Sequence, residues 1–168
     1  MIHHLSIAAG DPRHVADVLA ECMGGRAVPF PPHPGSFFAL ALDDKGTGVE
    51  VYPAGTELQE NGPEGGSFVV ERNARPHTAT HFALSVEADI DTIQRIADRE
   101  GWPCYVVNRG FFHVMELWIE GNGMVEILPP PFAQEYLAFA QPKNVERFQS
   151  EHPQAGTRSV SAPPASAS

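Results

Sequence analysis

The chain has 168 residues, of which 42% are hydrophobic, and a formal net charge of -10 at pH 7. This length and apolar content suit one compact domain or two tightly joined small ones. The negative charge repels phosphate backbones and anionic headgroups, which argues against nucleic-acid and membrane partners and favours a small-molecule ligand. The sequence shows no secretory pattern and no apolar stretch that could span a membrane, so we expect a cytoplasmic protein.

The first half of the chain predicts a strand, a helix and three further strands. Its opening strand alternates small with apolar residues, so that His4 begins a face of small side chains. Glu50 lies inside the last strand of this half, between two valines. The expected elements are strands at 4–9, 27–30, 36–42 and 48–52, and a helix that begins at Pro12 and ends at Gly24.

The second half repeats this order. His81 begins the face of small residues in its first strand, and Glu126 lies inside its last strand. The expected elements are strands at 80–86, 104–108, 111–120 and 124–128, and a helix that Asp89 caps and Gly101 closes. His81 follows His4 by 77 positions and Glu126 follows Glu50 by 76, so the chemistry and the scaffold repeat together.

The repeat divides the chain into five segments. The Gly-, Pro- and Glu-rich connection holds one expected short strand at 67–71, and the Ala-, Ser- and Pro-rich tail offers little apolar surface to bury. The two cysteines, Cys22 and Cys104, lack CxxC spacing and are expected to be buried thiols. The segments are a first βαβββ module (1–56), a connecting segment (57–78), a second module (79–131), a short C-terminal helix (132–148) and a disordered tail (149–168).

A glutamate flanked by apolar residues in a central strand is costly to bury unless its charge is paired, hydrogen-bonded or bound to a cation. If the two modules pack as pseudo-symmetric sheets, two histidines and two glutamates converge on one cavity. This mixed nitrogen and oxygen set suits a divalent ion such as Zn, Ni, Co, Mn or Fe. The candidate ligands are His4, Glu50, His81 and Glu126. Parity leaves open whether His113 lines the cavity or faces a helix, and His33 lies in a proline-rich loop with no assigned role.

With these four positions filled, residues 1–130 resemble the vicinal oxygen chelate superfamily, and within it the glyoxalase I type. The resemblance implies an α+β fold in which two βαβββ modules form a cup-shaped, partly open mixed sheet with the helices outside. It also implies that His4, Glu50, His81 and Glu126 hold one metal ion. Their order favours glyoxalase I over extradiol dioxygenases, which use two histidines and one glutamate, and over methylmalonyl-CoA epimerases, where glutamine is expected second.

The resemblance implies a metal-dependent lyase or isomerase that removes a carbon-bound proton next to a carbonyl. It gives the base role to Glu126, with Glu50 as second choice. Short bacterial glyoxalase I enzymes usually carry an arginine and an asparagine for glutathione where this chain has Ala8 and Ala54, which argues against a glutathione adduct. The alternatives are an antibiotic-like binding protein of the same fold, an epimerase or a dioxygenase. Two copies that expose sheet edges should associate, and relatives of this kind commonly place the cup at a two-fold interface, so a homodimer is expected.

Overall fold

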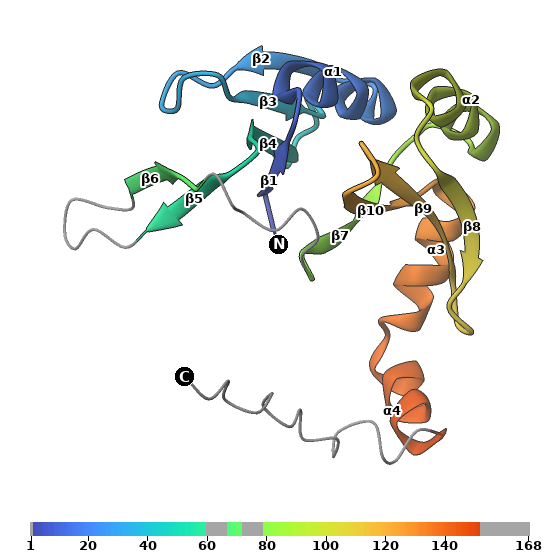
Figure 1. Cartoon of the computed structure of the whole chain (residues 1–168). Coiled ribbons are helices and arrows are strands. Elements are labelled where there is room, and N and C mark those ends of the chain that lie inside the picture. The colour runs from blue at the N-terminus through green and yellow to red at the C-terminus, as the bar shows by residue number, and fades with distance from the viewer. Residues whose placement is uncertain (1, 60–66, 72–78, 152–168) are drawn as a thin grey trace, which may run out of the picture.

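Two four-stranded mixed sheets follow each other along the chain, one from each module (Figure 1). The computed structural model describes residues 2–59, 67–71 and 79–151. In the first sheet the strand order is β1-β4-β3-β2, with β1 parallel to β4 and the other pairs antiparallel. The first module comprises β1 (His4–Ala9), α1 (Pro12–Met23), β2 (Arg26–Pro29), β3 (Phe37–Leu40) and β4 (Gly48–Pro53).

The second module has the same topology, with the strand order β7-β10-β9-β8 and a parallel pair between β7 and β10. Its elements are β7 (His81–Ser85), α2 (Ile90–Glu100), β8 (Cys104–Asn108), β9 (His113–Ile119) and β10 (Gly123–Leu128). The predicted α+β class and the two βαβββ modules are therefore confirmed. Figure 1 shows α1 and α2 near each other on the outer side of the two sheets.

The register of the two parallel pairs is the same in both modules. Ser6 lies opposite Glu50 in the first, and Ala83 lies opposite Glu126 in the second. Each histidine therefore stands two residues before the partner of the glutamate, on the same face of its strand. Exposure alternates along β1 and β7 in the predicted way, with the small-residue faces open and the apolar faces turned inward.

The helix of each module, α1 in the first and α2 in the second, begins and ends as its sequence predicts. The Asp11 side chain accepts a hydrogen bond from a backbone N–H at 3.1 Å, and the Asp89 side chain accepts one at 2.8 Å. Gly24 and Gly101 close the helices with φ of 68° and 67°, a left-handed conformation that a residue without Cβ adopts at little cost.

The core lies between the helices and the inward faces of the sheets. Leu19 of α1 and Ile93 of α2 are fully buried there, together with β-branched residues of the central strands. Cys22 and Cys104 are free and buried, as predicted. Burial raises the pKa of the Cys22 thiol to about 12 and that of Cys104 to about 11, because the charged thiolate is disfavoured away from water.

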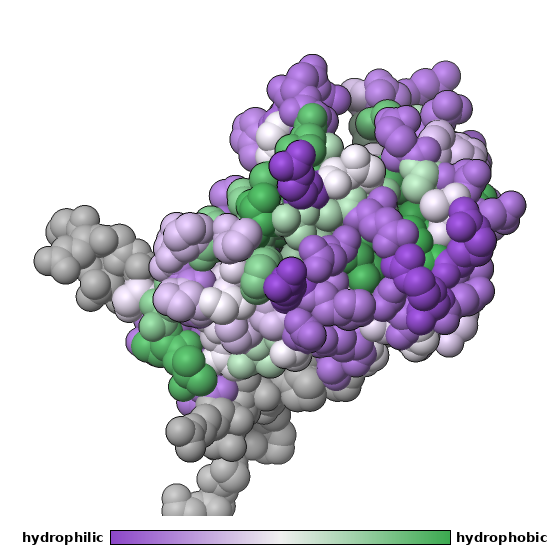
Figure 2. All heavy atoms as spheres, turned by 90° about the horizontal axis from the view of Figure 1, so that it is seen from above, coloured by the Kyte–Doolittle hydropathy of each residue, from purple (hydrophilic) through white to green (hydrophobic). Residues whose placement is uncertain are grey.

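A hairpin of β5 (Thr56–Gln59) and β6 (Ser67–Val70) forms an additional small sheet next to the first module. The expected short strand at 67–71 is found as β6, whereas β5 was expected to belong to an irregular connection. The hairpin projects from the end of β4 in Figure 1, and Figure 2 shows hydrophobic surface at this projecting end. Leu58, Phe68 and Val70 are exposed there.

The C-terminal region differs from the single helix expected at 132–148. It contains two helices, α3 (Pro130–Phe139) and α4 (Pro142–Glu151), that meet at a break. Pro142 lacks the backbone N–H that would continue α3, and its ring disfavours a helical residue before it. The expected tail at 149–168 is helical up to 151, and the rest lies outside the described residues. Within the described part of the chain, no helix is long and apolar enough to cross a membrane.

Candidate metal and substrate cavity

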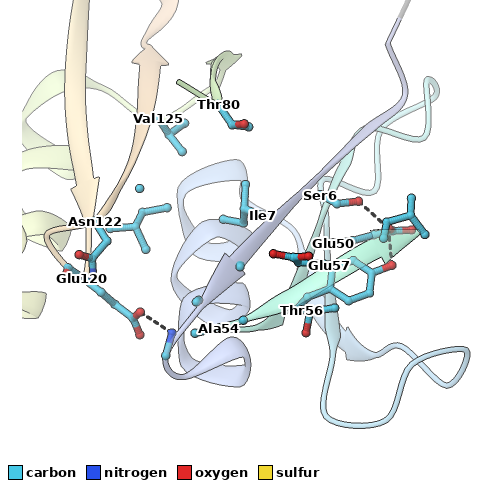
Figure 3. A pocket seen from close by; sticks show the side chains of 18 of the residues that line it. Ser6, Ile7, Glu50, Ala54, Thr56, Glu57, Thr80, Glu120, Asn122 and Val125 are labelled. Atoms are coloured by element: carbon cyan, nitrogen blue, oxygen red, sulfur yellow. Dashed lines mark hydrogen bonds between the residues drawn. The ribbon is translucent and has the colours of Figure 1, made fainter. Parts of the chain in front are cut away.

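A cavity of about 800 Å³ opens on the small-residue face of β1. Its walls come from β1, β4, the β5–β6 hairpin and the turn between β9 and β10. Figure 3 shows Glu50 and Ser6 on one side of the cavity and Glu120 and Asn122 on the other. The histidine and the glutamate of the first module, His4 and Glu50, both line it.

These two side chains form a pair. The His4 Nε2 atom lies 3.7 Å from the Glu50 Oε1 atom, and the His4 side chain is 54% exposed whereas that of Glu50 is 11% exposed. Two hydroxyls fix the other carboxylate oxygen, because Ser6 Oγ donates to Glu50 Oε2 at 2.8 Å and the Tyr52 hydroxyl donates to it at 3.0 Å. The cost of burying this carboxylate is therefore offset by hydrogen bonds to one oxygen, while the other oxygen faces the imidazole.

Local sequence explains this geometry. The parallel register places Ser6 beside Glu50, and the two-residue period of β4 puts Tyr52 on the same face. Gly48 lies opposite His4, and a Cβ atom at Gly48 would collide with the Phe38 ring. That ring packs edge-on against the His4 imidazole, with 6.1 Å between the ring centroids.

Tyr52 is held as a hydrogen-bond donor. Burial and the hydrogen bond to Glu50 raise its pKa to about 12. The phenol therefore stays protonated at neutral pH and keeps donating to the carboxylate.

His4 and Glu50 fit two donors of a divalent ion. Two ligand atoms bound to one ion at about 2.0–2.2 Å lie roughly 3–3.6 Å apart, close to the observed separation. His4, moreover, is partly exposed toward the cavity, where an ion could enter. Across residues 2–59, 67–71 and 79–151, however, no cluster of three or more His, Cys, Asp or Glu side chains is arranged to hold a metal ion. On its own, the first pair could therefore provide only two ligands of a coordination shell.

His81 and Glu126, the other two predicted ligands, do not line this cavity. His81 is exposed, and its Nδ1 atom lies 3.0 Å from the Ala79 carbonyl oxygen. Because a carbonyl only accepts, Nδ1 carries the proton, and in the neutral ring Nε2 keeps its lone pair, the arrangement typical of a metal-binding histidine. The single chain therefore brings His4 and Glu50 together, whereas His81 and Glu126 lie on the other sheet, each with a different partner.

Glu126 has a cationic partner that the sequence did not reveal. Arg109 Nη2 donates to Glu126 Oε1 at 2.8 Å and to Glu116 Oε1 at 2.6 Å. The two carboxylates face each other across the antiparallel β9–β10 pair, and the pKa of the Arg109 guanidinium is raised chiefly by its hydrogen bond to Glu126. The hairpin register could have signalled this contact, because two glutamates directly opposite each other destabilise a sheet and a cation between them relieves the repulsion.

The structure also places the two histidines that the sequence left open. His113 faces α3, where its Nδ1 lies 2.8 Å from Glu135 Oε2 and its ring packs on Phe132 at 5.5 Å. The His33 Nδ1 atom lies 2.8 Å from the Ser36 hydroxyl oxygen, and the His33 ring packs edge-on against the Tyr52 ring with 5.2 Å between centroids. Neither residue lines the cavity.

No protein-family model matches the sequence, and no curated protein matches it. Solved structures do match. Fosfomycin resistance protein FosX from Listeria monocytogenes, complexed with Mn(II) and sulfate, is 12% identical with a TM-score of 0.52, and the match covers 88% of this chain and 96% of that one. FosX from Mesorhizobium loti is 14% identical with a TM-score of 0.50, over 81% and 96%. Lactoylglutathione lyase from Agrobacterium tumefaciens is 13% identical with a TM-score of 0.48, over 76% and 91%.

At these identities the likeness concerns the fold. The chain shares its paired βαβββ fold with these FosX structures, and this is the fold that the sequence resemblance predicted.

Proposed function

We propose that the protein is a metal-dependent lyase or isomerase of the glyoxalase kind, acting on an α-hydroxycarbonyl-like small molecule. The observation that supports it is the His4–Glu50 pair, in which a buried carboxylate is oriented by Ser6 and Tyr52 and turns its second oxygen toward the imidazole and the cavity. This arrangement fixes donor atoms before any ligand arrives, which lowers the cost of binding a cation.

The residues of the chain would divide the work. A bound divalent ion would supply Lewis-acid polarisation of a substrate carbonyl, which acidifies the neighbouring carbon-bound proton. A carboxylate of the site would accept that proton as general base. Glu126 is assigned this role and Glu50 is the second choice. For Glu126 to act, its carboxylate must first leave the Arg109 guanidinium, which holds it at 2.8 Å.

The coordination shell would be completed by a second copy of the chain. Each copy would place the exposed His81 and the largely buried Glu126 of its second module over the His4–Glu50 pair of its partner in a homodimer. The open small-residue face of β7 supports this, because it leaves His81 accessible. The edge strand β8 also exposes Tyr105 and Val106 at 58% and 52%, which is apolar surface that a monomer would leave in water.

A binding protein of the same fold is the second candidate. The Arg109 contact favours it, because Glu126 Oε1 is already held by the guanidinium at 2.8 Å and is not free to accept a substrate proton. Such a protein would use the cavity to sequester a small molecule without turnover.

Metal stoichiometry and proton exchange separate the two candidates. The full chain is loaded with Zn, Ni, Co or Mn, and bound metal is measured by plasma emission for the wild type and for alanine variants at the four positions. Exchange of the α-proton of hydroxyacetone in deuterated water is followed by NMR. The proposal expects a metal-loaded wild type that exchanges protons and a Glu126→Gln variant that keeps much of its metal but exchanges roughly 10²–10⁴-fold more slowly. A wild type that binds none of these ions contradicts the metal site.

A further inference from the structure

An aromatic wall stands directly beside Glu50. The Tyr52 ring stacks on the Phe68 ring of β6, with 5.1 Å between centroids and 24° between planes. His33 packs edge-on against both rings, at 5.2 Å from Tyr52 and 4.9 Å from Phe68. His33 thus supports the two stacked rings from outside the cavity.

The wall faces the cavity and remains partly uncovered. Phe68 and Leu58 both line the cavity, and they are 38% and 68% exposed. Leaving such side chains in water is unfavourable, and a flat apolar group laid against them would recover part of that cost. Tyr52 connects the wall to the carboxylate, since its ring belongs to the stack while its hydroxyl holds Glu50.

The charge of the lining selects against anions. Among the described residues that line the cavity, three are glutamates and none is lysine or arginine. Gly10 and Asp11 donate backbone N–H groups to Glu120 at 2.6 and 2.9 Å, which fixes its carboxylate in place. Ala8 and Ala54 form part of the lining and offer no donor to a ligand carboxylate. An anionic ligand group would therefore approach two carboxylates, Glu57 and Glu120, that the proposed ion does not use.

We propose that this cavity takes a neutral or cationic α-hydroxycarbonyl compound whose flat apolar group, such as a phenyl ring, packs against Phe68 and Leu58. The inference rests on the proposed function, because it names the substrate class of that same cavity. The hairpin β5–β6 is then the element that determines specificity.

Binding is measured first, without reliance on turnover. NMR titrations of the metal-loaded and metal-free full chain compare 2-hydroxyacetophenone with hydroxyacetone, which lacks the ring. We expect 2-hydroxyacetophenone to bind about threefold to tenfold more tightly than hydroxyacetone, which is the range that one aromatic contact contributes. Phe68→Ala should remove most of this preference and Leu58→Ala part of it. Val70→Ala is the matched control, because Val70 lies on the same face of β6 and does not line the cavity.

A second comparison tests how the charge of the ligand affects its affinity. 2-Hydroxyacetophenone carrying a para-carboxylate should bind about threefold or more weakly than the same compound carrying a para-aminomethyl group, and added salt should narrow the difference. The inference is overturned if the ring-bearing and ring-free compounds bind equally well, or if Phe68→Ala keeps the preference for the ring. It is also overturned if the carboxylate compound binds more tightly than the aminomethyl compound, or if none of these compounds binds.

Proton exchange distinguishes failure of this inference from failure of the proposed function. If the loaded protein exchanges the α-protons of hydroxyacetone and 2-hydroxyacetophenone with equal efficiency, and Phe68→Ala changes neither, the enzyme stands and the substrate class is wrong. If the ring preference is present in binding but no compound exchanges protons, the aromatic wall stands and the proposed reaction is wrong.

Discussion

The two modules place a histidine and a glutamate in the same register and then give the two glutamates different partners. In the first module, Glu50 accepts hydrogen bonds from the hydroxyls of Ser6 and Tyr52. At the corresponding positions of the second module stand Ala83 and Leu128, which have no polar group to offer. A repeat of the scaffold has therefore not preserved the immediate surroundings of the carboxylate.

In the second module a guanidinium takes over the role of the hydroxyls. Arg109 bonds both Glu126 and Glu116, whereas the position corresponding to Glu116 in the first module is Phe38. Neutral donors orient Glu50 and leave its full charge to attract a cation. A cationic donor satisfies Glu126 already, so binding an ion there must first break an ion pair. In the proposed metal site, Glu50 could bind an ion directly, whereas Glu126 would first have to leave Arg109.

The largest effect on metal affinity is expected when the hydroxyl donors around Glu50 are replaced by apolar groups, as in the second module. Ser6→Ala combined with Tyr52→Phe removes both donors to Glu50 while keeping the shape of the cavity. Because groups that orient a ligand carboxylate are worth about 10–100-fold in metal affinity, we expect a loss of that size, measured by competition with a chelating dye. Tyr136→Phe, at a tyrosine of α3 that does not line the cavity, serves as control. Unchanged affinity in the double variant would show that Glu50 is not a ligand.

Removing the Arg109 partner of Glu126 should have a smaller effect, and it should increase metal affinity rather than decrease it. Arg109→Ala removes the cation between Glu116 and Glu126, so we expect metal affinity to rise about threefold to tenfold. The same change leaves two carboxylates opposite each other and should lower the free energy of unfolding by about 1–2 kcal/mol, measured in urea without metal. Arg13→Ala, at an exposed arginine of α1, is the control. A variant that loses metal affinity together with stability would mean that Arg109 positions Glu126 for binding.

Periodicity and capping were sufficient to predict most of the scaffold. The alternation along 4–9 and 80–86 predicted which face of each strand is open, and the Asp89 and Gly101 signals placed α2. These features depend on residues close in sequence. The strand Thr56–Gln59 was missed because its sequence alternates weakly and it pairs with a partner across a long connection.

The candidate site was predicted only in part, for a related reason. Sequence identified His4 and Glu50 through the repeat, and the structure places them together at the cavity. That His81 and Glu126 join them stays a prediction, since it depends on how modules or copies pack. Arg109 was missed because a loop arginine shows no periodicity, and its contact with Glu126 follows from the three-dimensional course of the β8–β9 turn.

The smallest expected effect is a change in thermal stability, and it comes from a contact that joins the two modules. Arg99 of α2 donates to both oxygens of Glu21 of α1, at 2.9 and 2.6 Å, and it also donates to Glu100 at 2.6 Å. The hydrogen bonds of Arg99 lower the pKa of both carboxyls, and His14 of α1 adds to the effect on Glu100 through a 2.6 Å contact. This network ties the two first helices together across the repeat.

A carboxyl with a lowered pKa in the folded state stabilises the protein above its ordinary value of 4.5, and this stabilisation is lost as the pH falls through the folded-state pKa. Arg99→Ala should therefore lower Tm at pH 7 and have little effect at pH 3, where the carboxyls are protonated in both proteins. Because Arg99 and Glu21 are about half exposed, solvent screens the pair and the shift at pH 7 should be at most about 3 °C. Calorimetry at the two pH values measures it, with Arg13→Ala as the control. An equal shift at pH 7 and pH 3 would mean that Arg99 acts through packing of its aliphatic stem between α1 and α2, and that charge contributes nothing to the contact between the modules.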